Sequence, residues 1–273
     1  MTDLRYRIVD VFSDRPLAGN ALCVVLDTCP ERWMTSIARE VNLSETTFPT
    51  VVASPTPAGS GAYATRIFTP GAELPFAGHP TIGTAWVLGQ GAWNQTSSGA
   101  VVAVEADAEG ARMVSPVPTL AEVDAAEAVA ALGLAVAEGA WLALAGGLHT
   151  LIVATDAAID ALQPDLPAVA QAAAAAAPGC ANVAVVRRRS DTALHVRVFV
   201  PGFGIPEDPG TGSAAGPIAT LARQQWRTDR EVTIHQGAEM GRPSTITVEL
   251  GPDGPIVGGH VSAFAEGRLT VPD

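Results

Sequence analysis

The stretch RIFTPG at residues 66–71 recurs as RVFVPG at residues 197–202, which begins 131 residues further along the chain. At the same offset LP at 74–75 matches IP at 205–206, so five of ten aligned positions are identical and two more are conservative apolar exchanges. In each copy a β-like run leads into a loop rich in glycine and proline, and an apolar segment follows. This internal repeat predicts two units of one topology in tandem.

The apolar segments after the two repeated loops are expected to be helices. The first begins near Gly78 and runs through Leu88, and the second begins near Gly212 and runs through Leu221. Both are apolar nearly all round, and a helix without a polar face requires burial on every side. Because the surrounding segments resemble short strands, the predicted fold class is α+β. It has two pseudo-equivalent domains, each a strongly curved, barrel-like β-sheet around a central helix.

Prolines 116 and 118 flank a strand end and mark the predicted domain boundary. The N-terminal domain is expected to span residues 1–116 and the C-terminal domain residues 117–260. Residues 261–273 contain a further β-like run that is expected to join the first domain. Residues 31–40 have the spacing of an amphipathic helix, and Glu45 follows them at a helix-to-strand junction.

Charge and composition exclude several classes of function. The formal net charge is -12, and all sixteen basic residues are arginine. Nucleic acid is therefore not an expected partner. Without lysine the chain can form neither a lysine Schiff base, which pyridoxal phosphate enzymes require, nor the lysine contact of a P-loop. The sequence contains no metal-binding motif, so a metal is not expected.

Location is predicted from three further features. The polar start of the chain is not typical of a signal peptide. No uninterrupted apolar run of about 18 residues would span a membrane. The three cysteines are odd in number and form no CxxC pair, which favours a reducing compartment. We therefore expect a cytoplasmic protein without a membrane segment, and the run Arg187–Arg189 is interpreted as a turn between strands.

Chemistry is expected where the repeated loops open the two helices. The free backbone N–H groups of a helix N-terminus can bind an anion. Three ionisable residues lie in or near these loops, namely Glu45, His79 and Asp208, and they suffice for general acid/base catalysis. Neither loop contains a cysteine, and no serine occupies a GxSxG elbow, so covalent catalysis is not indicated.

At these residues the sequence resembles the PhzF-like phenazine-biosynthesis family, within the diaminopimelate-epimerase-like fold. The resemblance follows the chain in the expected order over nearly its whole length. Its motifs are DVFSDRPLAGN (10–20), NLSETTF (42–48), RIFTP (66–70), ELPFAGHPTIG (73–83), EDPGTGSA (207–214), QGAEMGRPS (236–244) and GGHV (258–261).

The resemblance implies a cofactor-independent isomerase that acts on a small anionic substrate in a cleft between the two domains of a homodimer. In the phenazine enzyme the reaction is isomerisation of trans-2,3-dihydro-3-hydroxyanthranilate by a proton shift, a step of antibiotic and other secondary metabolism. Glu45 would take the proton and return it elsewhere on the conjugated system. The other residues that the resemblance assigns to the site are His79 and Asp208 as catalytic partners, and Asn20, Ser44, Gly78, Gly212 and Ser213 in substrate binding, with Asn20 in a supporting role.

Two alternatives remain open at this stage. An amino-acid racemase or epimerase would share the fold, but such enzymes carry one cysteine in each loop, where this chain has Ala77-Gly78 and Asp208-Pro209. A non-catalytic binding protein of the same fold would be favoured if Glu45 were exposed and remote from the loops. Glu73 is expected to hold loop geometry, for instance against Arg66, and His195 is expected to be structural.

Overall fold

The computed structural model describes residues 1–56, 59–98, 100–203, 205–228 and 231–273. The chain divides into two compact units, residues 1–114 with 258–273, and residues 115–257. We call them unit 1 and unit 2.

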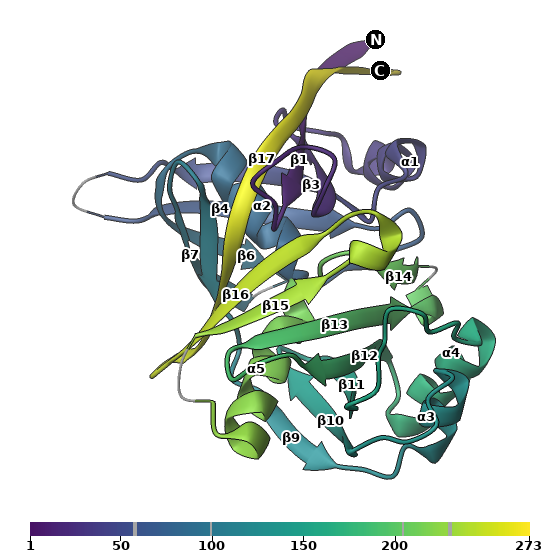
Figure 1. The fold of residues 1–273 in the computed structure, drawn as a ribbon. Helices are drawn as coiled ribbons and strands as arrows, with labels where there is room; N and C mark the ends of the chain where they lie inside the picture. Colours follow the sequence, from purple (N-terminus) through teal and green to yellow (C-terminus); the bar gives the residue numbers. More distant parts are fainter. Residues whose placement is uncertain (57–58, 99, 204, 229–230) are drawn as a thin grey trace. The chain divides into compact units, whose positions relative to one another are not determined.

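Unit 1 contains strands around one buried helix, with a second helix on the outside (Figure 1). Its elements are β1 (Thr2–Val11), β2 (Asn20–Val25), α1 (Glu31–Val41), β3 (Glu45–Ala53), β4 (Gly61–Phe68), β5 (Glu73–Leu74), α2 (Gly78–Leu88), β6 (Gly91–Ser97), β7 (Ala100–Ala106), β8 (Gly110–Val114) and most of β17 (Gly254–Val271).

Unit 2 has the same plan, with α3 and α4 packed together on its outer side (Figure 1). Its elements are β9 (Thr119–Glu122), α3 (Ala126–Ala131), β10 (Gly139–Ala145), β11 (Leu148–Ala154), α4 (Leu166–Ala176), β12 (Cys180–Arg188), β13 (Ala193–Val200), η1 (Pro201–Phe203), β14 (Ile205–Asp208), α5 (Gly212–Trp226), β15 (Val232–Gln236), η2 (Ala238–Met240) and β16 (Ser244–Gly251).

Strand pairing repeats element by element. In unit 1, β2 is antiparallel to β1 and, after the crossover helix α1, parallel to β3. β4 is antiparallel to β3 and β5 and, after α2, parallel to β6. In unit 2, β10, β11, α4, β12, β13, β14, α5 and β15 repeat this order with the same directions. The sequence repeat therefore lies at the ends of β4 and β13 and in the loops that follow them.

Both repeated loops contain a short strand that the sequence reading treated as loop. β5 and β14 fold back on β4 and β13, respectively. An arginine holds each one: Arg66 donates two hydrogen bonds of 2.7 Å to Glu73, which confirms the expected pairing. Arg197 donates two of 2.8 Å to Glu207. Paired guanidinium–carboxylate bonds of this kind fix direction as well as distance, so each loop enters its helix along a defined path.

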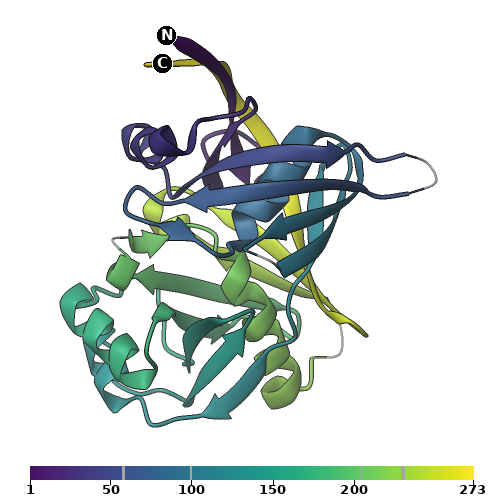
Figure 2. The ribbon, with the colours of Figure 1, turned by 180° about the vertical axis from the view of Figure 1, so that it is seen from behind.

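Strand β17 completes the sheet of unit 1. It pairs antiparallel with β1 and also pairs with β8, which continues from β7. The strands therefore form a closed ring around α2, which Figure 2 shows from behind.

Helices α2 and α5 occupy the two cores. Nine of the eleven residues of α2 and nine of the fifteen residues of α5 are buried. A Cβ atom on Gly83 would lie 2.7 Å from side-chain atoms of both Leu22 and Val11, so α2 approaches the sheet as closely as glycine permits. The expected α+β architecture, two similar curved sheets each around a central helix, is confirmed. Among the described residues, no helix combines the length and apolar character needed to cross a membrane.

Candidate active site

Glu45 is buried at the first position of β3. Helix α1 ends at Asn42, whose backbone adopts a left-handed conformation with φ 53° and donates to Ala38. This tight ending turns the chain so that β3 begins three residues later, with Glu45 opposite Leu22 of β2. Only 8% of Glu45 is exposed, so the exposure that would favour a non-catalytic protein is not observed. Ser44, directly before it, is half-buried.

His79 lies in the first turn of α2 and faces this carboxylate. Its Nε2 atom is 3.2 Å from Glu45 Oε2, within ion-pair distance, although the two groups are not aligned as a hydrogen bond. Burial lowers the pKa of His79 to about 3, while a hydrogen bond with the backbone of Ala21 acts in the opposite direction. Desolvation disfavours the charged imidazolium, so the ring is neutral at physiological pH.

Asn20 lies beside that ring. It is fully buried at the start of β2, and its amide Nδ2 lies 3.2 Å from His79 Nδ1. The contact orients the ring, and which group donates depends on the ring nitrogen that carries the proton. Gly19 makes this placement possible: its φ is +67°, and a Cβ there would lie 2.3 Å from the carbonyl oxygen of Val11.

The first backbone amides of α2 lie beside this pair. The cap position Ala77 is extended, and no side chain of the described residues caps the helix. Pro80 has no N–H, and Thr81 returns both its N–H and its hydroxyl to the carbonyl of Ala77, at 3.4 and 2.9 Å. The amides of Gly78 and His79 therefore remain for an anion, and the helix dipole favours negative charge there.

A buried layer of polar side chains contacts the start of α2. Tyr63 of β4 donates to Gln95 Oε1 of β6 at 2.8 Å, and Gln95 Nε2 donates to Thr81 Oγ1 at 2.8 Å. Sequence reasoning missed these residues. Tyr63 and Gln95 are ordinary strand positions, and only the pairing of β4 with β6 brings them together.

In unit 2 a second polar cluster surrounds the start of α5. Asp208 is buried at the end of β14 and accepts a hydrogen bond from the hydroxyl of Thr211. Gln236 of β15 donates to the carbonyl of Asp208 at 2.7 Å and to Thr211 Oγ1 at 2.9 Å, and its Oε1 accepts from the Thr211 N–H at 3.2 Å. Gln236 therefore binds the loop as Gln95 binds Thr81 in unit 1, and sequence reasoning assigned it no role.

Gly212 and Ser213 are the first residues of α5, and Gly212 is buried whereas Ser213 is half-buried. Within the described residues, no side chain caps α5 at Thr211. The first backbone amides of α5 are therefore uncapped, as are those of α2. The predicted site residues thus form two groups, one within each unit. The predicted cleft between the domains stays a prediction.

The three cysteines are free thiols, and all three are buried. Burial raises the pKa of Cys23, in the core strand β2, to about 12 and also raises those of Cys29 and Cys180. Nucleophilic or proton-abstracting cysteine acts as a thiolate, which these environments disfavour. The expected structural role of Cys23 in a core strand is consistent with its full burial.

One group in the described part of the chain has metal-ligand chemistry. It consists of Asp160, His195 and Glu239, whose ligand atoms lie within 4.8 Å of one another. Arg189 Nη2 is 3.0 Å from His195 Nδ1, so a guanidinium cation occupies that side of the ring. This arrangement does not fit a cation site.

A family model described as phenazine biosynthesis-like protein (PhzC-PhzF) matches residues 9–261. The chain belongs to the PhzF-like family. Trans-2,3-dihydro-3-hydroxyanthranilate isomerase of Pseudomonas aeruginosa is 37% identical to it, over 97% of this chain and 98% of that protein. As its curated relatives are named isomerases, this PhzF-like chain is an isomerase.

Solved structures agree with this assignment. A PhzF-family protein of Enterococcus faecalis is 27% identical, with a TM-score of 0.80 over 99% of this chain and 100% of that one. A probable proline racemase of Agrobacterium radiobacter is 13% identical, with a TM-score of 0.65 over 98% of this chain and 93% of that one. The second likeness shows the fold alone.

Proposed function

We propose that this PhzF-like isomerase shifts a proton within a small conjugated carboxylate, with Glu45 as the group that carries it. The observation that supports this most directly is the placement of the buried Glu45 carboxylate 3.2 Å from a neutral imidazole. An imidazolium with a pKa of about 3 is scarcely populated at neutral pH. In this proposal His79 therefore orients and polarises, and the carboxylate handles the proton.

The proposed reaction needs no external electron acceptor. Glu45 removes a proton from a carbon of the substrate and becomes a carboxylic acid, while the electron pair of the C–H bond moves into the conjugated system. The acid then returns the proton to another carbon as the double bonds shift. Atoms and electrons balance within the substrate and Glu45, so the reaction proceeds without a cofactor. The amides of Gly78 and His79 hold the substrate's carboxylate or the developing oxyanion.

Trans-2,3-dihydro-3-hydroxyanthranilate is the proposed substrate, because it is the substrate in the name of the Pseudomonas aeruginosa relative. Asp208 and the first amides of α5, at Gly212 and Ser213, are proposed to serve the same substrate. The homodimer and the cytoplasmic location also stay predictions. Burial raises the pKa values of all three cysteines, so these thiols do not support the racemase alternative.

The test is incubation with trans-2,3-dihydro-3-hydroxyanthranilate in heavy water, followed by NMR, for the wild type, Glu45→Gln and Glu40→Gln. Glu40 is a matched control, because it is an exposed carboxylate on α1 of the same unit. We expect turnover with deuterium incorporation, a loss of about 10²–10⁴-fold in Glu45→Gln, and wild-type rates in Glu40→Gln.

The remaining outcomes are equally informative. A folded Glu45→Gln variant that retains the wild-type rate would remove Glu45 from the mechanism. A folded wild type that neither converts the compound nor incorporates deuterium would remove this substrate. Other conjugated amino acids and cyclic imines would then be tried in the same assay.

A further inference from the structure

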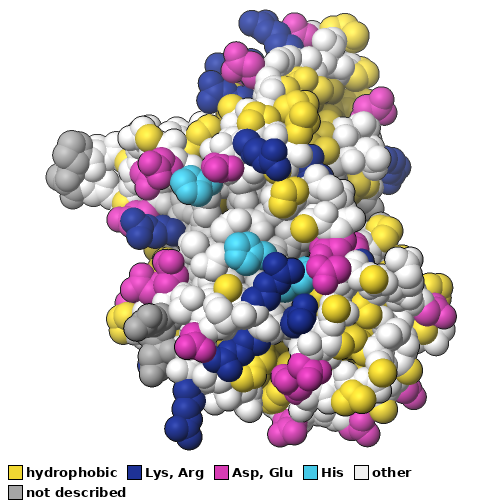
Figure 3. All heavy atoms as spheres, in the orientation of Figure 1, with side chains coloured by type: hydrophobic (Ala, Val, Ile, Leu, Met, Phe, Trp, Pro, Cys, Tyr) yellow, Lys and Arg dark blue, Asp and Glu magenta, His cyan; other side chains and the backbone are white. Residues whose placement is uncertain are grey.

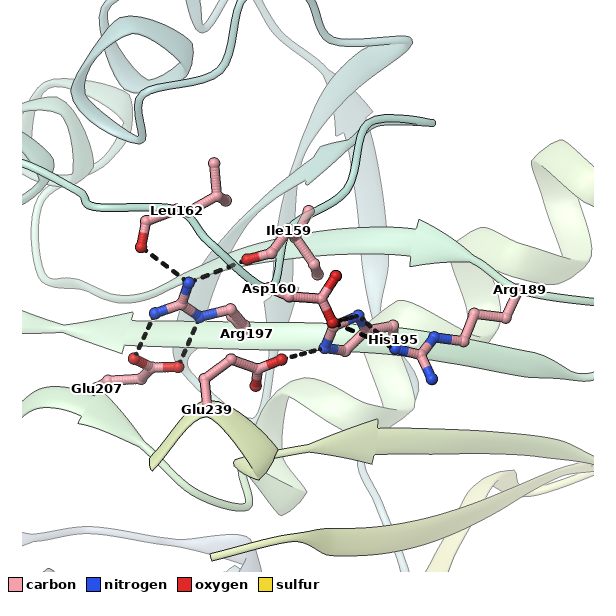
Figure 4. A network of polar contacts seen from close by, with 8 residues as sticks. All are labelled: Ile159, Asp160, Leu162, Arg189, His195, Arg197, Glu207 and Glu239. Carbon is pink, nitrogen blue, oxygen red and sulfur yellow. Dashed lines mark hydrogen bonds and ion pairs between the residues drawn. The ribbon is translucent and has the colours of Figure 1, made fainter. Parts of the chain in front are cut away.

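Strand β13 carries two charged or polar side chains that the proposed reaction does not use. His195 and Arg197 are two residues apart and therefore project from the same side of the strand (Figure 4). Both are buried, with exposed fractions of 2% and 6%. Histidine, arginine and acidic side chains gather on the surface over β13 and β15 (Figure 3).

Arg197 holds the strand that enters the loop of Asp208. Its guanidinium binds both carboxylate oxygens of Glu207 at 2.8 Å and donates to the carbonyls of Ile159 and Leu162 at 3.0 Å. Asp208 is the next residue. The corresponding arginine of unit 1, Arg66, makes the same bidentate bond to Glu73, so this anchor is common to both repeats.

His195 holds the segment on the other side of that loop. Its Nδ1 accepts from Arg189 at 3.0 Å, because a guanidinium can only donate. Its Nε2 carries a proton and donates it to Glu239 Oε1 at 2.8 Å. Glu239 lies in η2, three residues after Gln236, and its side chain is only 11% exposed.

Between Gln236 and Glu239 the backbone is in direct contact with the loop that contains Asp208. A Cβ atom on Gly237, whose φ is +76°, would lie 2.5 Å from the carbonyl oxygen of Pro209. Gln236 itself binds Asp208 and Thr211. A shift of η2 would therefore displace two contacts that define the start of α5.

The His195 anchor belongs to unit 2 alone. At the offset of the sequence repeat, residue 195 corresponds to Ala64, an exposed small residue. Unit 1 forms the same fold without this histidine, so the fold itself does not require His195. Its contacts are instead directed at the loop that contains Asp208.

We propose that His195 is a positioning residue. Through Glu239 it fixes the segment 236–240, and through that segment it aligns the Asp208–Thr211 loop and the first amides of α5 for the anionic substrate. The part that concerns the substrate rests on the proposed function, whereas the alignment of the loop does not.

The test uses two substitutions that each reproduce one ring nitrogen. In His195→Gln the side-chain amide reaches the position of Nε2 and can still donate to Glu239. In His195→Asn it reaches only the position of Nδ1, so the bond to Glu239 is lost. Glu239→Ala removes the same bond from the other side and serves if His195→Asn does not fold.

Hydrogen exchange in the substrate-free protein is the first readout. The amides of Thr211, Ala214 and Ala215 are hydrogen-bonded at the loop, as those of Met240 and Arg242 are at η2. We expect roughly tenfold faster exchange at these amides in His195→Asn and Glu239→Ala. Exchange in β11 and β12 should be unchanged, and His195→Gln should be close to wild type.

Activity is the second readout. With trans-2,3-dihydro-3-hydroxyanthranilate we expect His195→Asn to raise KM roughly tenfold and to lower kcat less. Unchanged loop exchange, equal behaviour of the Asn and Gln variants, or faster exchange throughout unit 2 would overturn the inference. If the wild type does not turn over this compound, the proposed substrate fails, and the exchange pattern still decides the role of His195.

Discussion

The pH dependence of stability follows from the burial of His79. Its pKa falls to about 3 in the folded protein, whereas the ordinary value, which applies to the unfolded chain, is about 6.5. Below pH 6.5 the unfolded chain binds a proton that the folded protein rejects. Stability contributed by the neutral ring is therefore present above pH 6.5, declines as the pH falls, and reaches its lowest level near pH 3.

The size of the effect follows from the two pKa values. Each pH unit between them changes the free energy of unfolding by about 1.4 kcal/mol, so lowering the pH from 7 to 4.5 destabilises the folded state by about 2–3 kcal/mol through this residue. His79→Gln removes the titrating group. Carboxylates that do not contact His79 contribute to both proteins alike and cancel when the two losses are compared; Glu45, 3.2 Å from the ring, is the exception.

The assay is urea unfolding at pH 7 and 4.5, followed by the amide NMR signals of unit 1, for the wild type, His79→Gln and the control His149→Gln. His149 is a half-buried histidine of β11 in unit 2. We expect the wild type and the control to lose about 2–3 kcal/mol more than His79→Gln. An equal loss in all three, or a His79 ring signal that titrates near pH 6.5, would refute the proposed neutral imidazole.

Three further expectations concern unit 1. Gly19→Ala should lower the free energy of unfolding in urea by about 2 kcal/mol or more, because its Cβ would lie 2.3 Å from a carbonyl oxygen in a left-handed conformation. The control is Gly71→Ala, whose Cβ would have only one neighbouring atom, at 3.9 Å, and should change that free energy by no more than about 0.5 kcal/mol. Tyr63→Phe should cost about 1–3 kcal/mol in the same assay, because Gln95 Oε1 loses the donor at 2.8 Å and remains buried; no measurable cost would contradict the polar layer. Val101 is 65% exposed, and the positions directly beside it on β6 and β4, Thr96 and Ala64, are uncharged. If the expected homodimer uses this face, Val101→Arg should give a monomer by light scattering, and an unchanged mass would exclude the face.

Local chemistry explains which parts of the site were predictable. The start of α2 was placed at Gly78 because an apolar segment without a polar face follows a loop of glycine and proline, and both signals lie within a dozen residues. The pairing of Arg66 with Glu73 was expected because an acidic and a basic residue lie only seven positions apart around one loop. From its own surroundings Glu45 resembles an exposed loop carboxylate, and its burial depends on the parallel pairing of β3 with β2.

By itself, the sequence determined the tandem architecture, the two core helices and the residue types at their starts. Hydrophobic periodicity and loop composition are local properties, and in a repeat each of these signals occurs twice. Only the tertiary structure decided which groups meet. Asn20 and His79 are 59 residues apart and His195 and Glu239 are 44 apart. Such contacts depend on strand register and on the direction of each side chain, because a slip of one residue turns a side chain to the opposite face of the sheet.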